Sequence, residues 1–439
     1  MNVIGRARRF DIPLLFAVYA LLTIGILFIY SGNITSQASF SQQEHVRQIT
    51  WALLGTALLF GVAATDLDRI RRYSAWIYVG IVLLLVATLL FGRVMNGARR
   101  WIGLFGFGMQ PSEFAKIGVI IFLARLMEAS GSEIRQLYQF LLFIAAVMLP
   151  LILVLLQPDL GTAIAFTPAL FTMALVAGAT PRHLIFFAAT GVLTLVIAAL
   201  PSVGEHVLTD ISNVLGVFAS PRFVLLMAAA LVAVVIIGLI ATVITRKHLF
   251  SWVSFAAGVG ASSVIGGFLI QRVLRPYQIM RMIVFLDPQI DPQGSGWHTI
   301  QSLTAVGSGG FSGKGLFEGT QSQYQYLPLQ STDFIFSILA EEWGFLGALL
   351  VFALYGFLLF RGLVIAARAR DMFSALLATG VTTLFAFHFF VNVGMTVGIM
   401  PITGIPLMLF SYGGSSVWAA MICVGLLVNV SARSGPAGL

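Results

Sequence analysis

Long apolar runs separated by short polar connections fill most of this chain. Each run is about 18–24 residues long, enough for an α-helix to cross a hydrocarbon core of roughly 30 Å. The pattern therefore predicts an all-α, polytopic transmembrane bundle, a single integral membrane domain over residues 1–439. The predicted spans are 13–30, 48–65, 74–92, 113–129, 139–156, 162–178, 183–200, 222–244, 250–271, 334–360, 373–393 and 412–431.

Composition strengthens this interpretation. Hydrophobic residues make up 59% and charged residues 10% of the 439 residues, and the mean hydropathy is +0.96. Soluble domains carry about 25% charged residues. The first run follows Arg6, Arg8 and Arg9, but it exceeds the roughly 7–15 apolar residues of a signal peptide and is interpreted as a retained span. The single cysteine, Cys423, excludes an intrachain disulfide.

The distribution of basic residues predicts the orientation. Most of the 25 Lys and Arg residues fall in connections on one side of the predicted bundle. The positive-inside rule assigns that side to the cytoplasm, so both termini are expected there. The net charge of +8 reflects this bias and does not indicate nucleic-acid binding. Three outward segments follow: residues 93–112, 272–333 and 394–411.

Two of the outward segments are unusually basic. Outward loops are normally poor in Lys and Arg, so basic outward loops on one bundle favour a site for an anionic substrate. Anchoring to lipid headgroups at the ends of spans is the alternative, and it explains Arg93 and Arg272 as well. The outward cations are Arg93, Arg99, Arg100, Lys116, Arg272, Arg275, Arg281 and Lys314.

The first outward segment leads into a span through Gln110-Pro-Ser-Glu113. We expect Ser112 to cap the helix and Pro111 to occupy its first turn. Glu113 and Lys116 are three residues apart, so they share a helical face and can pair. An unpaired charge at this depth would cost at least about 2.5–3.5 kcal/mol. Trp101 is either an interfacial belt residue or a platform for stacking a sugar.

The second outward segment, 272–333, is rich in glycine and contains two Asp-Pro steps, which predict turns rather than a span. Its glycines around Lys314 suggest a phosphate cradle, although the spacing matches no standard motif. Asp333 stands at the entrance of an apolar helix, a setting that suits a general base and equally suits an N-cap. Glu341 and Glu342 lie deeper, and at least one of them should face a partner inside the bundle.

The third outward segment, 394–411, is broken by glycines and prolines at membrane depth. Such backbone is tolerated only where it is buried in protein or lines a cavity, so we interpret it as a cavity wall. His298 and His388 lack metal-ligand spacing and are expected to be structural. No closed set of ligands appears, so the sequence leaves open whether a divalent cation such as Mg²⁺ or Mn²⁺ takes part.

In combination, these segments resemble the SEDS family of cell-wall glycosyltransferases, and within it the RodA branch. The resemblance covers nearly the whole chain. The motifs that carry it are Gly97-Ala-Arg-Arg-Trp101, Gln110-Pro-Ser-Glu113 with Lys116, Gln157-Pro-Asp-Leu-Gly161, Phe285-Leu-Asp-Pro288, Gly307-Ser-Gly-Gly310, Gly319-Thr-Gln-Ser322, Thr332-Asp-Phe-Ile-Phe336, Asn392-Val-Gly-Met395 and Ser411-Tyr-Gly-Gly-Ser-Ser416.

The resemblance implies an inverting glycosyltransferase that polymerises lipid II into peptidoglycan strands at the outer face of the bacterial cytoplasmic membrane, during elongation and shape maintenance. It implies that Asp333 is the general base and that Glu113 and Lys116 form a supporting ion pair. Cations hold the pyrophosphate of the undecaprenyl donor, and a class B penicillin-binding transpeptidase is the usual partner. The substrate-binding residues implied in this way are Arg99, Arg100, Trp101, Arg275, Arg281, Lys314 and Ser416.

The chain departs from the family pattern in several places. Ser331 stands where the family usually has His, Leu329 follows Leu327-Pro328 where Glu is usual, and Pro406 is followed by Leu-Met-Leu rather than Leu-Pro-Phe. The family usually has ten spans, so residues 201–271 are expected to hold an extra transmembrane hairpin. A lipid II flippase and a non-catalytic scaffold for cell-wall enzymes remain the competing functions. A flippase would be expected to show internal repeats and midplane charges, neither of which is evident.

Overall fold

The computed structural model describes residues 11–33, 43–95, 98–104, 107–273, 276–324 and 326–434. The chain divides into two compact units, Met1–Ala179 with Gln301–Leu439, and Thr180–Ile300. Within the described residues, ten helices are long and apolar enough to cross a membrane. The chain is therefore a multi-pass helical membrane protein, as the apolar runs predict.

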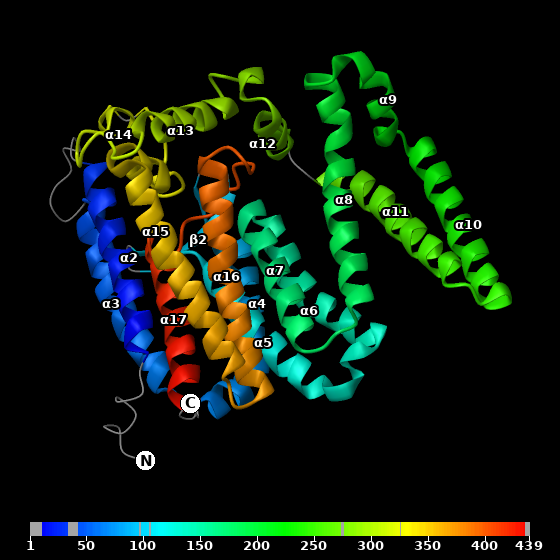
Figure 1. Ribbon diagram of the computed structural model, residues 1–439, viewed down its shortest axis with the longest axis horizontal. Coiled ribbons are helices and arrows are strands. Elements are labelled where there is room, and N and C mark those ends of the chain that lie inside the picture. Colours follow the sequence, from blue (N-terminus) through cyan, green and yellow to red (C-terminus); the bar gives the residue numbers. More distant parts are fainter. Residues whose placement is uncertain are drawn as a thin grey trace. The chain divides into compact units, whose positions relative to one another are not determined.

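The first unit is a bundle whose helices match the predicted spans. Its most deeply buried members are α16 and α17, which pack among the others, and α15 runs beside α16 (Figure 1). Its long helices are α2 (Ile12–Ser31), α3 (Glu44–Ala64), α4 (Leu67–Phe91), α5 (Pro111–Ser130), α6 (Leu137–Leu156), α7 (Leu160–Val176), α15 (Ile335–Ala367), α16 (Met372–Thr396) and α17 (Gly414–Arg433).

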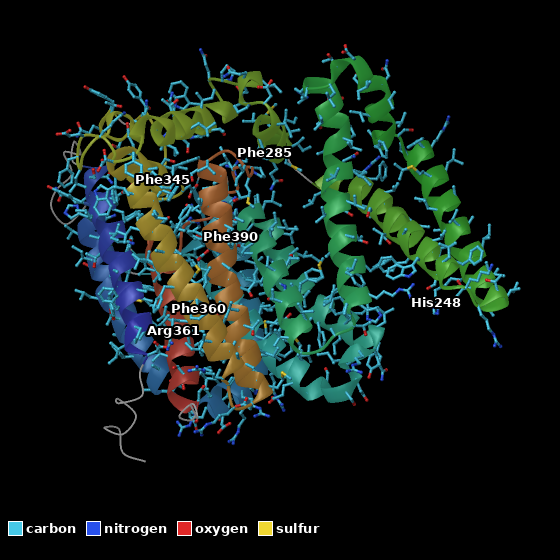
Figure 2. The ribbon with its side chains drawn as sticks, in the orientation of Figure 1. His248, Phe285, Phe345, Phe360, Arg361 and Phe390 are labelled. Carbon is cyan, nitrogen blue, oxygen red and sulfur yellow. The ribbon has the colours of Figure 1, made fainter. Side chains whose placement is uncertain are left out.

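Aromatic side chains lie on the outside of this bundle. Phe345, Phe360 and Phe390 are each more than half exposed and project outward from α15 and α16 (Figure 2). Exposure of such rings to water is unfavourable, whereas contact with the hydrocarbon of a membrane is favourable. At one end of the bundle, Arg361 pairs with Asp11 at 2.5 Å, so α15 ends where α2 begins.

The second unit contains three long helices and a run of short ones. The middle of the unit is α11 (His248–Val273), which packs against both α8 (Pro181–His206) and α10 (Pro221–Thr245). Glycines permit this closeness, because a Cβ at Gly267 would lie 2.9 Å from Cβ of Ile197 on α8. The short helices are η3 (Thr209–Ile211), α9 (Ser212–Gly216), η4 (Val217–Ala219), α12 (Pro276–Leu286) and η5 (Pro288–Ile290).

Segment 93–112, which is expected to face outward, contains strands that the sequence analysis does not predict. β1 (Arg93–Met95), β2 (Ala98–Leu104) and β3 (Phe107–Met109) form an antiparallel sheet in the order β1-β2-β3. Trp101 pairs with Arg93, and Ile102 pairs with Met109. The sheet leads directly into α5 and gives this segment a defined backbone.

Segment 272–333, which is also expected to face outward, is more helical than its glycines and prolines predict. Besides α12, it holds α13 (Ser295–Gly309) and α14 (Thr320–Gln323). Ser302 of α13 bonds to Ser337 of α15 and to the carbonyl of Thr396 at the end of α16, both at 2.7 Å. The described part of this segment holds no helix long enough to be a span, as expected. Much of it is nevertheless helical rather than turns, because helix packing overrides the local preference of glycine.

A break in α15 anchors the loop that follows α13. Gly344 has φ +61° and ψ −154°, a conformation that is essentially restricted to glycine. The break leaves the amides of Phe345 and Leu346 without helical acceptors, and they donate to the carbonyls of Gly310 and Phe311 at 2.9 and 3.1 Å. The loop thus replaces the helical hydrogen bonds that the break removes, and leaving these amides unsatisfied would be costly.

The same loop bonds to the two buried glutamates, and Lys314 neutralises Glu341. The amides of Lys314 and Gly315 donate to the carbonyls of Glu341 and Glu342 at 3.0 Å each. The Glu341 carboxylate accepts from Lys314 Nζ at 2.7 Å, and Glu342 accepts from Ser31 Oγ at 2.5 Å. The prediction that these acids face partners inside the bundle is confirmed. The amides of Lys314 and Gly315 already serve as donors to α15, which argues against the predicted phosphate cradle at these two residues.

Replacing Gly344 with alanine should destabilise the protein. The new Cβ would meet the backbone nitrogen of Gly313, and the backbone conformation would cost about 1–3 kcal/mol. We expect a lower unfolding temperature in detergent, measured by the fluorescence of a thiol- or tryptophan-based thermal assay. Gly356→Ala is the matched control on the same helix, because nothing lies within 4 Å of its Cβ. Equal unfolding temperatures for the two variants would contradict the interpretation.

Candidate active site

Asp333 lies in the turn that immediately precedes α15. The N-cap of that helix is Phe334, so the structure does not support the alternative of an N-cap aspartate. Asn392 Nδ2 on α16 donates to the carbonyls of Asp333 and Ile405, both at 2.8 Å. A Cβ on Gly404 would lie 3.5 Å from Asp333 Oδ2. The half-buried carboxylate therefore lies beside the loop between α16 and α17.

Glu113 and Lys116 form the ion pair that their spacing predicts. Lys116 Nζ lies 2.8 Å from Glu113 Oε1, and both side chains are almost fully buried within the bundle. Pro111 occupies the first turn of α5, as expected. Ser112 does not cap it, because the N-cap is Gln110 and the helix begins one residue before Ser112.

The lysine has a second partner that the sequence analysis does not associate with it. Nε2 of His388, on α16, lies 3.0 Å from Lys116 Nζ, and Nδ1 lies 2.9 Å from the carbonyl of Pro406. His388 is only 1% exposed. It was expected to be a structural histidine. The signal in the sequence that could have indicated a role in the site is the position of His388. It lies four residues before Asn392, on the same helical face, and just before the segment 394–411 that glycines and prolines break.

The loop between α16 and α17 is held by side chains from other helices. Gln48 on α3 donates to the carbonyl of Ser411 and accepts from the amide of Gly413, at 3.0 and 3.1 Å. The amide of Tyr412 donates to the carbonyl of Ser331, 2.8 Å away and two residues before Asp333. Ser416 follows in the first turn of α17 and is buried. The predicted cavity wall is thus tied to the Asp333 turn.

The start of α5 joins the same neighbourhood. The amide of Gln110 donates to Ser415 Oγ at 2.9 Å, and its side chain donates to Asp159 at 3.0 Å. Arg100 on β2 donates to the carbonyls of Gln157 and Pro158. These bonds connect the small sheet, the turn before α7 and the start of α17.

The remaining cations differ in what they contact. Arg99 is exposed, and its Nη1 lies 3.4 Å from the carbonyl of Leu89. Lys314 is held by Glu341, as described above. Arg281 is exposed on α12 of the second unit, where its charge adds to burial in lowering the pKa of His298. Arg275 lies outside the described residues.

Trp101 packs onto the sheet itself. A Cβ on Gly108 of β3 would lie 3.2 Å from the Trp101 ring, which is half-buried. The ring therefore covers the neighbouring strand. This contact fits either expectation for Trp101, a belt residue or a stacking platform.

Several buried polar atoms in these elements have no protein hydrogen-bond partner among the described residues. They are acceptors or hydroxyls, and buried groups of this kind normally bond to something. They are Ser112 Oγ, Glu113 Oε2, Gln157 Oε1, Asn392 Oδ1 and Thr403 Oγ1.

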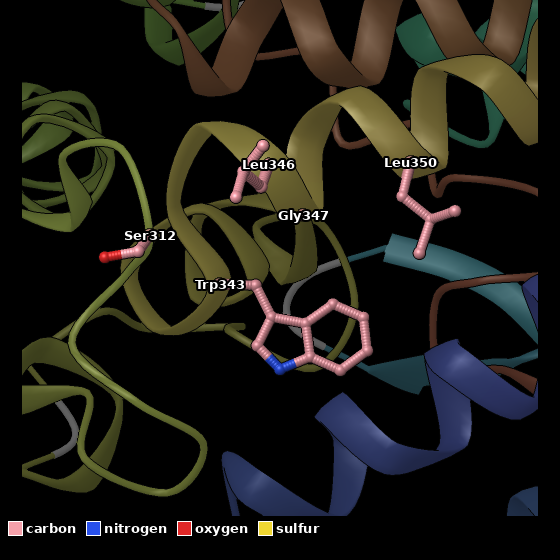
Figure 3. Close-up of a pocket in the computed structure, with 5 residues that line it drawn as sticks. All are labelled: Ser312, Trp343, Leu346, Gly347 and Leu350. Atoms are coloured by element: carbon pink, nitrogen blue, oxygen red, sulfur yellow. The ribbon is translucent and has the colours of Figure 1, made fainter.

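A separate pocket lies beside the break in α15. It is lined by Ser312, Trp343, Leu346, Gly347 and Leu350, and the Trp343 ring turns toward it (Figure 3). None of the candidate charged residues contributes to this lining. The lining of the pocket is mostly apolar, with Ser312 as its polar member.

Comparisons with known proteins cover almost the whole chain. A family model described as a cell cycle protein, FtsW/RodA/SpoVE, matches residues 13–210 and 201–435. The peptidoglycan glycosyltransferase RodA of Treponema pallidum is 45% identical over 428 residues, 97% of this chain and 98% of that protein. The stage V sporulation protein E of Bacillus subtilis is 32% identical over 97% of each chain.

Solved structures give the same picture. One chain matches with a TM-score of 0.65 and 27% identity, covering 96% of this chain and 97% of the other, from work titled "Structural coordination of polymerization and crosslinking by a peptidoglycan synthase complex". A crystal structure of the rod shape determining protein RodA of Thermus thermophilus matches with a TM-score of 0.60 and 24% identity, covering 97% of each chain. The latter likeness concerns the fold alone.

Proposed function

Because the chain belongs to the FtsW/RodA/SpoVE family of cell cycle proteins, we propose that it is a peptidoglycan glycosyltransferase that polymerises lipid II. Its active site is the neighbourhood of Asp333, at the outer face of the bacterial cytoplasmic membrane. The observation that carries this assignment is the position of the Asp333 carboxylate beside Gly404, in a turn bonded to the loop between α16 and α17. The buried Glu113–Lys116 pair is connected to that loop through His388.

The reaction needs a base and a means of stabilising the leaving group. Asp333 accepts the proton of the 4-hydroxyl of an acceptor N-acetylglucosamine as that oxygen bonds to the anomeric carbon of the lipid-linked N-acetylmuramic acid. The bond from that carbon to the pyrophosphate breaks with inversion, and undecaprenyl pyrophosphate leaves with the electron pair. A carboxylate within hydrogen-bond reach of the hydroxyl is the usual general base in such a step.

Negative charge builds up on the departing pyrophosphate, so cations should surround it. Arg99 is an exposed guanidinium of the small sheet and takes this role, while Arg100 positions the sheet on the turn before α7. In this proposal Trp101 and Ser416 line the sugar-binding part. Lys116 supports the site from within the bundle, where the Glu113 carboxylate neutralises the charge of its ammonium group.

The orientation follows from charge. Arg361 and Arg433 pair with Asp11 and Asp66 at the end of the bundle where α2 begins and α17 ends. The positive-inside rule makes that end cytoplasmic, which puts Asp333 at the opposite, outer end of α15.

The proposed partner is a class B penicillin-binding transpeptidase, which would cross-link the strands that this protein makes. Support comes from the structural relative described in the work on coordination of polymerization and crosslinking by a peptidoglycan synthase complex. The hairpin of α10 and α11, which overlaps the predicted extra pair at residues 201–271, is proposed as an addition to the ten usual spans.

Purified protein supplied with fluorescent lipid II tests the proposal. We expect glycan strands that a muramidase digests, visible as a ladder on a gel. Translocation of lipid II across vesicles without polymer would support a flippase, and partner binding without polymer would support a scaffold. Running the assay with EDTA, Mg²⁺ or Mn²⁺ decides whether a divalent cation takes part, which the donor groups on the chain leave open.

A further inference from the structure

His388 sits between the buried ion pair and the loop beside Asp333. Its Nε2 lies 3.0 Å from Lys116 Nζ, and its Nδ1 lies 2.9 Å from the carbonyl of Pro406. The ring is 1% exposed, so neither nitrogen can exchange these partners for bulk water. The two contacts therefore determine its protonation.

The chemistry of the partners assigns the tautomer. A lysine ammonium only donates hydrogen bonds, so Nε2 must accept from Lys116. A carbonyl only accepts, so Nδ1 must carry the hydrogen that is donated to Pro406. His388 is therefore neutral, with its proton on Nδ1, as long as Lys116 is charged and paired with Glu113 at 2.8 Å.

The segment that His388 holds is the one beside the catalytic carboxylate. Gly404 lies next to Asp333 Oδ2, and its φ of +71° makes the turn there. Asn392, one helical turn after His388, donates to the carbonyl of Ile405 and to the carbonyl of Asp333. One face of α16 thus bonds to consecutive carbonyls of the loop and to the Asp333 backbone.

We propose that His388 is a positioning residue that couples the Glu113–Lys116 pair to Asp333 through residues 404–406. It touches no reacting atom. Because the neutral ring bonds to both groups, the position of the Lys116 ammonium determines the position of residues 404–406. These residues in turn set the position of the Asp333 carboxylate relative to the acceptor hydroxyl. The effect on catalysis rests on the proposed glycosyltransferase function, whereas the coupling of the two contacts does not.

Two isosteric substitutions separate the two contacts. The amide of an asparagine reaches the position of Nδ1, so His388→Asn keeps a donor for Pro406 and loses the acceptor for Lys116. The amide of a glutamine reaches the position of Nε2, so His388→Gln keeps the acceptor and loses the donor. The loss of one hydrogen bond corresponds to about a tenfold change in a rate or equilibrium.

We expect both variants to polymerise lipid II about tenfold more slowly in kcat, with KM near the wild-type value. Hydrogen exchange should rise in residues 403–410 for His388→Gln and stay near wild type for His388→Asn. His248→Gln, an exposed histidine in the second unit, is the control and should change neither readout. A histidine that merely fills the core would instead lower the unfolding temperature and leave kcat per folded molecule unchanged.

Wild-type kcat in both variants, or unchanged exchange over residues 403–410 in His388→Gln, would overturn the coupling. If the wild-type protein makes no polymer at all, the proposed function fails. The exchange measurement still decides whether His388 holds the loop, so the two failures are distinguishable.

Discussion

Replacing Asp333 with asparagine is expected to slow glycan polymerisation by about 10²–10⁴-fold, the usual contribution of a general base. The amide is close in shape to the carboxylate, so the turn before α15 should persist. The backbone bonds of that turn, from Asn392 and to Leu329, do not involve the carboxylate. Lipid II binding and the unfolding temperature should therefore stay close to wild type, and polymer yield should not.

The comparison needs a variant that removes a carboxylate from the same loop without touching the site. Glu318→Gln meets this need, because Glu318 is exposed on the loop that leads to Asp333. Polymerisation by Glu318→Gln should match wild type. Wild-type rates in Asp333→Asn, measured on protein with no contaminating glycosyltransferase, would remove Asp333 from the role of base.

Asp333→Glu refines the same prediction. The carboxyl group is retained but displaced by one methylene, and an error of about 1 Å in position can cost around 10²-fold. We expect a rate between those of the wild type and Asp333→Asn. A fully active glutamate variant would show that the charge near Gly404 matters and its location does not.

The helices were predictable because their signal is local. Each apolar run forms a helix. The observed ends of the helices differ from the predicted ends mainly where additional turns with charged residues extend the helix. The helix of residues 74–92 begins at Leu67, and that of residues 334–360 continues to Ala367. Hydropathy marks the part of a helix in hydrocarbon, whereas a helix continues into the headgroup region where Arg71 or Arg361 can pair.

The small sheet shows a signal that the sequence contains and the analysis of apolar runs passes over. Asn96-Gly97 lies between β1 and β2, and Asn-Gly is a strong dipeptide signal for a two-residue hairpin. The insertion of residues 310–315 at the break in α15 has no such signal. It depends on Gly344 meeting a segment some thirty residues earlier in the chain, a tertiary event.

The contacts of the candidate site likewise include some that the sequence predicts and others that depend on tertiary packing. Glu113 and Lys116 are three residues apart on one helix, so their pairing could be predicted from spacing alone. His388 is 272 residues from Lys116, and nothing local indicates that the two meet. Asn392 likewise reaches Asp333 only because α16 packs beside α15.

Removing one member of the buried ion pair is expected to have the largest effect on stability. Lys116→Met preserves side-chain length but leaves the Glu113 carboxylate buried without its counter-charge, and His388 loses its donor. Breaking a buried pair in this way typically costs about 3–5 kcal/mol. We expect a markedly lower unfolding temperature in detergent, lower yield of folded protein and no detectable polymer.

The double variant Glu113→Gln with Lys116→Met separates folding from catalysis. It removes both charges together, and replacing a buried pair with neutral groups is often close to neutral for stability. The unfolding temperature should therefore recover toward wild type, while polymerisation should stay low because the donor that orients His388 is still missing. If the double variant regained wild-type polymerisation, the pair would serve folding only, and the route from Lys116 through His388 to the Asp333 loop would carry no catalytic effect.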